Sequence, residues 1–144
     1  MGDACELLVA GELTLAGVPA MRAPDFWPGY DIVAQPPGRP LQRISVKSRT
    51  FKKGAAFVSY SSRDPFDWLA IVIISLDSNA RSMFLIPREI ADRKARTYKT
   101  EGTANLREYR IDEVEALFAE FRNNFTLNGA GHAAGQKWQL GDMF

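Results

Sequence analysis

Cysteine and histidine are nearly absent from this sequence of 144 residues. It contains one of each, Cys5 and His132. A single cysteine excludes an internal disulfide and is typical of a reducing compartment, so we expect a cytoplasmic protein. A zinc site built only from cysteine and histidine needs four ligands, and one chain cannot supply them here.

Long apolar stretches are missing as well. No run approaches the roughly 20 residues that a membrane-spanning helix needs, and we expect no membrane association. The first residues lack the basic segment followed by an apolar one that marks a secretory signal. A hydrophobic content of 46% and a charged content of 24% are ordinary for a globular protein. The length predicts one domain with a single core.

Acidic residues are absent from residues 32–63, although the net charge of the chain is only +1. The bases of that stretch are Arg39, Arg43, Lys47, Arg49, Lys52, Lys53 and Arg63. A second basic group consists of Arg88, Arg93, Lys94, Arg96 and Lys99. Clustered positive charge attracts polyanions, with an affinity that falls as salt rises. A solvated basic face without a partner would have the same composition, so charge alone does not decide.

Hydrophobic patterning predicts a helix, then several strands, then a helix. The first helix is expected over 4–17, with Asp3 as its N-cap and Gly17 at its end. Strands are expected at 18–23, 30–35, 41–50, 57–60, 67–74 and 82–86, with turns at 36–40, 52–54 and 77–79. A short helix begins at Pro87, and 111–125 is expected to form the last helix, capped by Asp112.

The hairpin formed by the strands at 30–35 and 41–50 carries an acid and a lysine. Asp31 stands near the start of the first strand, and Lys47 shares one face of the second strand with Ser45. Adjacent strands would bring the acid and the lysine close together on one face. Taken singly, Asp31 could be only a hydrogen-bonding group of a turn, and Lys47 only a solvated side chain.

This order of elements resembles the PD-(D/E)XK nuclease superfamily, and within it small endonuclease-like domains related to Holliday-junction resolvases. Residues 5–13, with Glu6, resemble the glutamate-bearing first helix of such domains. Residues 30–33 resemble the metal-binding aspartate strand, and residues 44–48 the acid-x-Lys strand. Shorter likenesses to the later strands and the closing helix lie at 67–71, 86–89 and 121–125.

The resemblance implies a fold as well as a site. It implies a single restriction-endonuclease-like α/β domain over residues 1–128, with a central mixed β-sheet flanked by helices in α-β-β-β-β-α order. Residues 129–144 are expected to form a Gly/Ala-rich C-terminal tail.

By the same resemblance, the chain is a metal-dependent endonuclease. Asp31 would be the principal ligand of Mg²⁺ or Mn²⁺, Glu6 a second carboxylate, and the carbonyl of Val46 a backbone ligand. Lys47 would orient the attacking water or offset charge on the phosphate. Asp25 follows a proline and spells the family motif literally, but it precedes the strand, so Asp31 is the favoured acid.

Ser45 departs from the pattern, because the family has Glu, Asp or in some branches Gln at this position. A hydroxyl coordinates Mg²⁺ only weakly and adds no charge. Three alternatives therefore stay open: a weakened DNA endonuclease, a catalytically inactive nucleic-acid binder, and a protein-interaction module. The candidate residues for binding duplex or branched DNA are Arg43, Arg49, Lys52, Lys53 and Arg63.

Two further expectations concern partners. A homodimer is expected, since two copies are the simplest way to cut both strands of a duplex. The aromatic candidates for a protein interface are Trp27, Phe51, Trp138 and Phe144. A glycine pattern at 129, 131 and 135 follows a helix and not a strand, so we expect no nucleotide cofactor.

Overall fold

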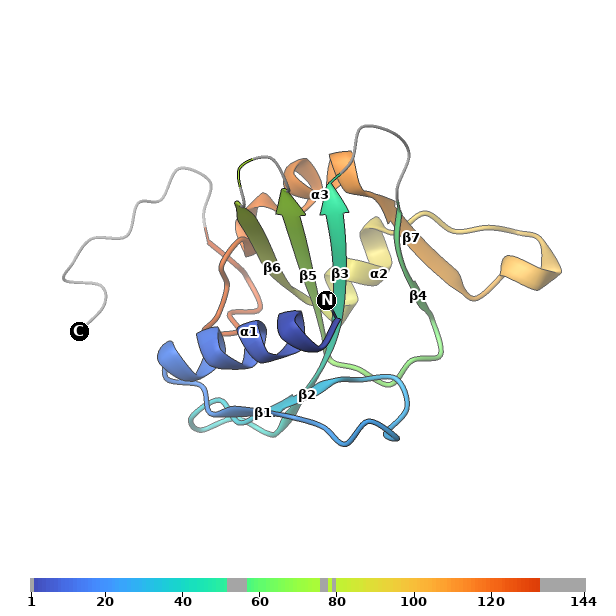
Figure 1. Ribbon diagram of the computed structural model, residues 1–144. Helices are drawn as coiled ribbons and strands as arrows, with labels where there is room; N and C mark the ends of the chain where they lie inside the picture. Colours follow the sequence, from blue (N-terminus) through green and yellow to red (C-terminus); the bar gives the residue numbers. More distant parts are fainter. Residues whose placement is uncertain (1, 52–56, 76–77, 79, 133–144) are drawn as a thin grey trace.

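The computed structural model describes residues 2–51, 57–75, 78 and 80–132 (Figure 1). Its elements are α1 (Gly2–Leu15), β1 (Ala20–Arg22), β2 (Ile32–Ala34), β3 (Gln42–Phe51), β4 (Phe57–Ser61), β5 (Trp68–Ser75), β6 (Arg81–Pro87), α2 (Arg88–Lys94), η1 (Glu101–Thr103), β7 (Leu106–Arg110), α3 (Ile111–Leu117) and η2 (Ala119–Phe121). Within these ranges, no helix is long and apolar enough to cross a membrane.

The main sheet has the strand order β1-β2-β3-β5-β6. The neighbours β3 and β5 run parallel, and the other pairs run antiparallel. The expected central mixed sheet is therefore confirmed. A second, two-stranded antiparallel sheet joins β4 to β7.

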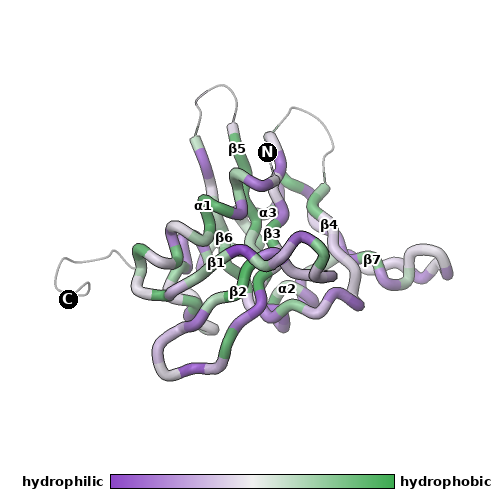
Figure 2. Tube along the Cα trace, turned by 60° about the horizontal axis from the view of Figure 1, so that its bottom comes forward, coloured by the Kyte–Doolittle hydropathy of each residue, from purple (hydrophilic) through white to green (hydrophobic). Residues whose placement is uncertain are grey.

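Side chains of β5 pack on both faces of the main sheet. Trp68, Ala70 and Val72 pack with residues of α1, whereas Leu69 and Ile71 pack with residues of β4, β7 and α3. Both views place α1 on one side of the sheet and β4, β7 and α2 on the other, and Figure 2 shows β5 as hydrophobic. A strand that is buried on both faces has a continuous run of apolar residues in its sequence. This is why the sequence predicts β5 well.

The first helix begins earlier than expected. It starts at Gly2, so Asp3 lies in its first turn and the expected N-cap at Asp3 is wrong. Cys5, Val9 and Leu13 recur at helical spacing and are buried against the sheet. The chain turns at Gly17, where φ is +92°, a conformation that favours glycine.

Other boundaries are close to expectation. The strand expected over 30–35 is shorter, since β2 spans only Ile32–Ala34. The short helix after Pro87 is present as α2. The turn expected at 52–54 and most of the turn at 77–79 lie outside the described residues.

The last helix is shorter than the apolar stripe predicted. It ends at Leu117, and Arg110, not Asp112, occupies its N-cap position. Phe121 packs in the core cluster on the α3 side, whereas Phe125 packs against the α1 side. One straight helix cannot direct two side chains four residues apart to opposite faces of a sheet, so the chain changes course between them.

Candidate active site

One edge of β3 is left open where β2 ends. Strand β2 pairs with β3 only as far as Ile44, whereas β3 continues to Phe51 along β5 on its other side. Asp31 stands at this point: its backbone N–H donates to the Ile44 carbonyl (2.8 Å), and its Oδ2 accepts from the Val46 N–H (2.8 Å). The carboxylate therefore replaces the next residue of β2 in the ladder.

The carbonyl of Val46 points to the same open edge. In a strand, the N–H and C=O of one residue face the same neighbour, and the Val46 N–H faces Asp31. The Val46 carbonyl oxygen thus lies on the side of the Asp31 carboxylate, past the last pair that β2 makes. A carboxylate and a backbone carbonyl come together there.

Glu6 reaches this region from α1. Its side chain is 17% exposed, and Arg22 Nε lies 3.4 Å from its Oε1. Burial raises the pKa of Glu6 above its ordinary value of 4.5, the charge of Asp31 raises it further, and Arg22 partly offsets both. The two carboxylates are therefore close enough to repel one another.

Lys47 and Ser45 lie on the face of β3 opposite α1. Ile44 packs with α1, and alternate residues of a strand face opposite ways. Lys47 is half-buried and forms no hydrogen bond or ion pair with any residue that the structure describes. Ser45 is only 2% exposed. The structure thus groups Asp31, Glu6 and Val46, whereas Lys47, the next residue of β3, faces the side of the sheet opposite α1.

The donor set is small but suits a hard cation. Within the described ranges, no three Asp, Glu, His or Cys side chains form a cluster that could hold a metal ion. Mg²⁺ commonly binds through one or two carboxylates and keeps several waters. Two carboxylates and one carbonyl meet that requirement, provided that Glu6 exchanges Arg22 for the cation.

Arg43 is engaged inside the protein, which the sequence did not predict. Its backbone N–H and Nε donate to Asp67 Oδ2 (2.8 and 3.1 Å), and a terminal nitrogen donates to Oδ1 (3.2 Å). Burial acts to raise the pKa of Asp67, but the hydrogen bonds from Arg43 outweigh it, so the pKa lies below 3.8. The two residues are 24 apart, and no local pattern links them.

The remaining candidates for DNA binding differ in which hydrogen-bond and ion-pair partners their side chains have. Arg49 donates to the carbonyls of Phe57 (3.0 Å) and Ser48 (2.7 Å) but has no acidic partner among the described residues. Arg63 is exposed, and its guanidinium has no partner in the same ranges. Lys52 and Lys53 lie outside the described residues.

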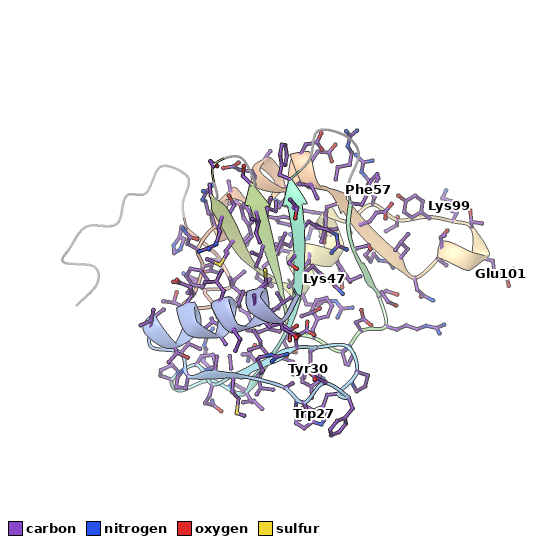
Figure 3. The ribbon with its side chains drawn as sticks, viewed as in Figure 1. Trp27, Tyr30, Lys47, Phe57, Lys99 and Glu101 are labelled. Carbon is purple, nitrogen blue, oxygen red and sulfur yellow. The ribbon has the colours of Figure 1, made fainter. Side chains whose placement is uncertain are left out.

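Most members of the second basic group are engaged by an acid or by a backbone carbonyl. Its ion pairs are Arg88–Asp92, Arg93–Glu89 and Arg96–Glu113, and Lys94 donates to the Leu117 carbonyl. Lys99 lies on the segment that extends away from the body between α2 and β7 (Figure 3).

Asp25 and the aromatic candidates also have clear positions. The Asp25 side chain is 94% exposed and forms an ion pair with Arg22, at 3.5 Å. Trp27 and Phe51 are exposed, whereas Trp138 and Phe144 lie outside the described residues.

The solved structures that resemble this chain include two nucleases. A bacterial homing endonuclease, I-Ssp6803I, has 18% sequence identity and a TM-score of 0.50 over 76% of this chain and 71% of that one. Hjc, a Holliday junction resolvase from the archaeal hyperthermophile Archaeoglobus fulgidus, has 20% identity and a TM-score of 0.45 over 79% of this chain and 89% of that one. No family model and no curated protein matches the sequence.

The chain therefore has the restriction-endonuclease-like fold of the PD-(D/E)XK nucleases. The resemblance inferred from short sequence segments is confirmed at the level of fold. At such low identity, function has to be argued from the site itself.

Proposed function

We propose that this protein is a divalent-metal-dependent DNA endonuclease that hydrolyses phosphodiester bonds. Asp31, Glu6 and the Val46 carbonyl would hold Mg²⁺ or Mn²⁺, and Lys47 would act on the phosphate. The observation that carries the proposal is the open edge of β3, where the Asp31 carboxylate repels Glu6 and binds the N–H of Val46, one residue before Lys47 in the strand. Carboxylates held together without a resident cation cost free energy that a bound cation recovers.

The chemistry divides between the cation and the chain. When bound, a divalent cation lowers the pKa of water and offsets phosphate charge. Lys47 supplies a positive charge that no described acid neutralises, so it can bind a phosphate oxygen or orient a water. Arg22 holds the Glu6 carboxylate in place until a cation competes for it.

A catalytically inactive nucleic-acid-binding protein is the second candidate, and Ser45 favours it. A buried hydroxyl replaces the acid that the family has at this position, which removes one negative charge from the ligand set. Such a protein would bind DNA without metal and would not cut it. An interaction module for a protein partner is a third possibility for the same inherited fold.

Calorimetry with Mn²⁺ tests the metal site. Asp31→Asn keeps an acceptor oxygen for the Val46 N–H but removes the charge, and we expect it to abolish binding. Asp25→Asn is the matched control, because Asp25 is an exposed acid outside the open edge, and it should bind as the wild type does. Equal binding by all three proteins would refute the site.

A cleavage assay then separates the two candidates. We expect the wild type to nick DNA in Mn²⁺ and Lys47→Ala to lose this activity while it still binds metal. Lys99→Ala serves as the control and should cut normally, because Lys99 lies on the extended segment between α2 and β7. A wild type that binds DNA but never cuts it would support the inactive binder.

A further inference from the structure

We infer that Phe26 and Trp27 form a stacking surface for unpaired nucleobases beside the candidate active site. The substrate class would then be DNA with unpaired or displaced bases next to the bond to be cut, rather than a perfect duplex. This inference rests on the proposed function, because it names the kind of nucleic acid that the same site takes.

The two aromatic side chains are exposed on the loop formed by residues 24–30. Phe26 is 83% exposed and Trp27 is 41% exposed. Trp27 packs edge-on against Tyr30, with ring centroids 5.8 Å apart. Single exposed apolar residues are common on protein surfaces, but two consecutive exposed aromatic rings next to a candidate catalytic acid offer flat surfaces to a ligand.

The loop is held firmly from beneath. Gly29 has φ of +84°, and a Cβ there would lie 2.1 Å from Pro65 Cδ, so the two loops are in close contact. The Arg43 guanidinium lies over the Tyr30 ring, 6.0 Å from its centroid, and Asp67 fixes Arg43. The aromatic pair is therefore presented in a set position, which lowers the entropy lost on binding.

The position of the loop connects it to the site. Tyr30 directly precedes Asp31 and packs on the same side of the sheet as the face of Lys47. Figure 3 shows Trp27 and Tyr30 below Lys47, on the side of the molecule where β2 leaves β3. Asp31 follows Tyr30 directly in the chain, so a nucleic acid stacked on this loop would extend toward the candidate site.

The combination of residues favours unpaired bases. Proteins that bind single strands use aromatic rings for the bases and positive charge for the backbone. In a perfect duplex, the faces of the bases are already stacked on each other and are closed to such rings. Bases in a bulge, a branch or a single strand have free faces, and they would fit beside the Lys47 charge.

Fluorescence anisotropy without divalent metal tests the inference, since no cleavage can then occur. The probes are a labelled duplex and the same duplex with a bulge of unpaired nucleotides. We expect the wild type to prefer the bulged probe, and Trp27→Ala to bind that probe about five- to 150-fold more weakly, with little change for the duplex. Trp27→Phe, which keeps an aromatic ring, should recover most of the affinity.

Phe26→Ala guards against a folding effect, because an 83% exposed side chain contributes little to stability. Leu15→Ala is the matched control, since Leu15 is 85% exposed at the far end of α1. We expect Phe26→Ala to weaken binding of the bulged probe and Leu15→Ala to leave it unchanged.

The failures of the two proposals can be told apart. A wild type that cuts both probes equally, with no effect of the aromatic substitutions, would overturn the inference and keep the nuclease. A wild type that binds neither probe would overturn both. Substitutions that change self-association in sedimentation but not DNA binding would assign the aromatic pair to a protein interface and overturn the inference.

Discussion

Ser45 lies between Ile44, the last residue of β3 that pairs with β2, and Val46, whose N–H donates to Asp31. As a small neutral residue, it adds no charge to the candidate site. The side chain is buried on the face that it shares with Lys47, next to Leu69 of β5 in the register of the sheet. A serine fits there at no electrostatic cost. An acid would have to be compensated by positive charge, which Lys47 on the same face or a bound cation could supply.

Ser45→Glu should therefore destabilise the metal-free protein and gain metal dependence. We expect a loss of about 3 kcal/mol in the free energy of unfolding, because the new carboxylate takes a position that is only 2% exposed. Saturating Mn²⁺ should restore much of the loss in a thermal unfolding experiment. Ser45→Gln, of nearly the same shape but uncharged, should respond less to the metal. An equal response of both variants would contradict this prediction.

The pH dependence of metal binding should report Glu6. Its pKa lies above 4.5 because of burial and the neighbouring Asp31 charge, and its protonated form cannot serve as a ligand. Affinity should therefore begin to fall, on acidification, already above pH 4.5. Arg22→Gln removes the charge that lowers this pKa, so the fall should move to higher pH. Calorimetry over a pH series measures both proteins.

The same shift affects stability without metal, with a definite sign. The folded protein binds the Glu6 proton more tightly than the unfolded chain does, so stability falls as pH rises from the unfolded pKa through the folded one. Glu6→Gln removes this contribution. Subtracting its unfolding curve from that of the wild type should leave a difference that declines across this window and is flat above it.

Among the larger elements, the loop over residues 24–30 depends on close contact with the loop before β5. Gly29 approaches Pro65 so closely that no side chain fits between them, and its φ of +84° also favours glycine. The contact holds the chain that leads into Asp31. The geometry of the open edge of β3 therefore depends on a residue with no side chain.

Gly29→Ala should be more harmful than Gly38→Ala. Both positions have positive φ, but a Cβ at Gly38 meets nothing within 4 Å. The conformation alone should cost each variant about 1 kcal/mol. Gly29→Ala must also displace Pro65, so it should lose more in chemical denaturation and bind Mn²⁺ less well. Equal losses for the two variants would show that the contact with Pro65 is unimportant.

The sequence predicted some elements more accurately than others, and the accuracy depends on how much apolar surface each element buries. Strand β5 is apolar on both faces and was located almost to the residue. Strand β7 was missed, because only Tyr109 of its five residues is fully buried and three of the other four carry charges. The last helix was extended too far, since its apolar stripe joins residues that serve opposite faces of the sheet.

For the candidate site, the sequence could supply residue types but not their partners. Asp31 and Val46 lie within one hairpin, so local spacing was enough to bring these two residues together. The pairs Glu6–Arg22 and Arg43–Asp67 join distant segments, and one sequence contains no signal for them. These two pairs change the roles expected of Glu6 and Arg43. Glu6 is paired with Arg22, and Arg43 is engaged by Asp67 within the fold.

Across the whole molecule, ion pairing decides which bases remain available to a polyanion. The group around α2 is mostly paired with acids, whereas Arg63 and Lys47 have no partner in the described parts of the chain. The net charge of +1 conceals this difference. The electropositive surface should therefore be centred on β3 and on the loop that follows β4.

The salt dependence of DNA binding tests this charge distribution. Each phosphate contact contributes about 0.9 to the slope of log affinity against log salt. Arg63→Ala should reduce the slope by about 1, whereas Arg93→Ala, whose charge is paired with Glu89, should leave it unchanged. The two slopes come from binding titrations at several salt concentrations. A larger effect of Arg93→Ala would place the DNA on α2 instead.

Asp31 has a structural role in this fold, because its side chain accepts a backbone hydrogen bond, in addition to any chemistry that it performs. Its carboxylate accepts the Val46 N–H where β2 ends, so a related chain without nuclease activity would still need an acceptor there in order to fold. Lys47 forms no such bond with any described residue, so other residues could replace it once activity was lost. Among related domains, the aspartate should therefore be kept in active and inactive members alike. The lysine should be kept only in the active members, so it is the residue that distinguishes them.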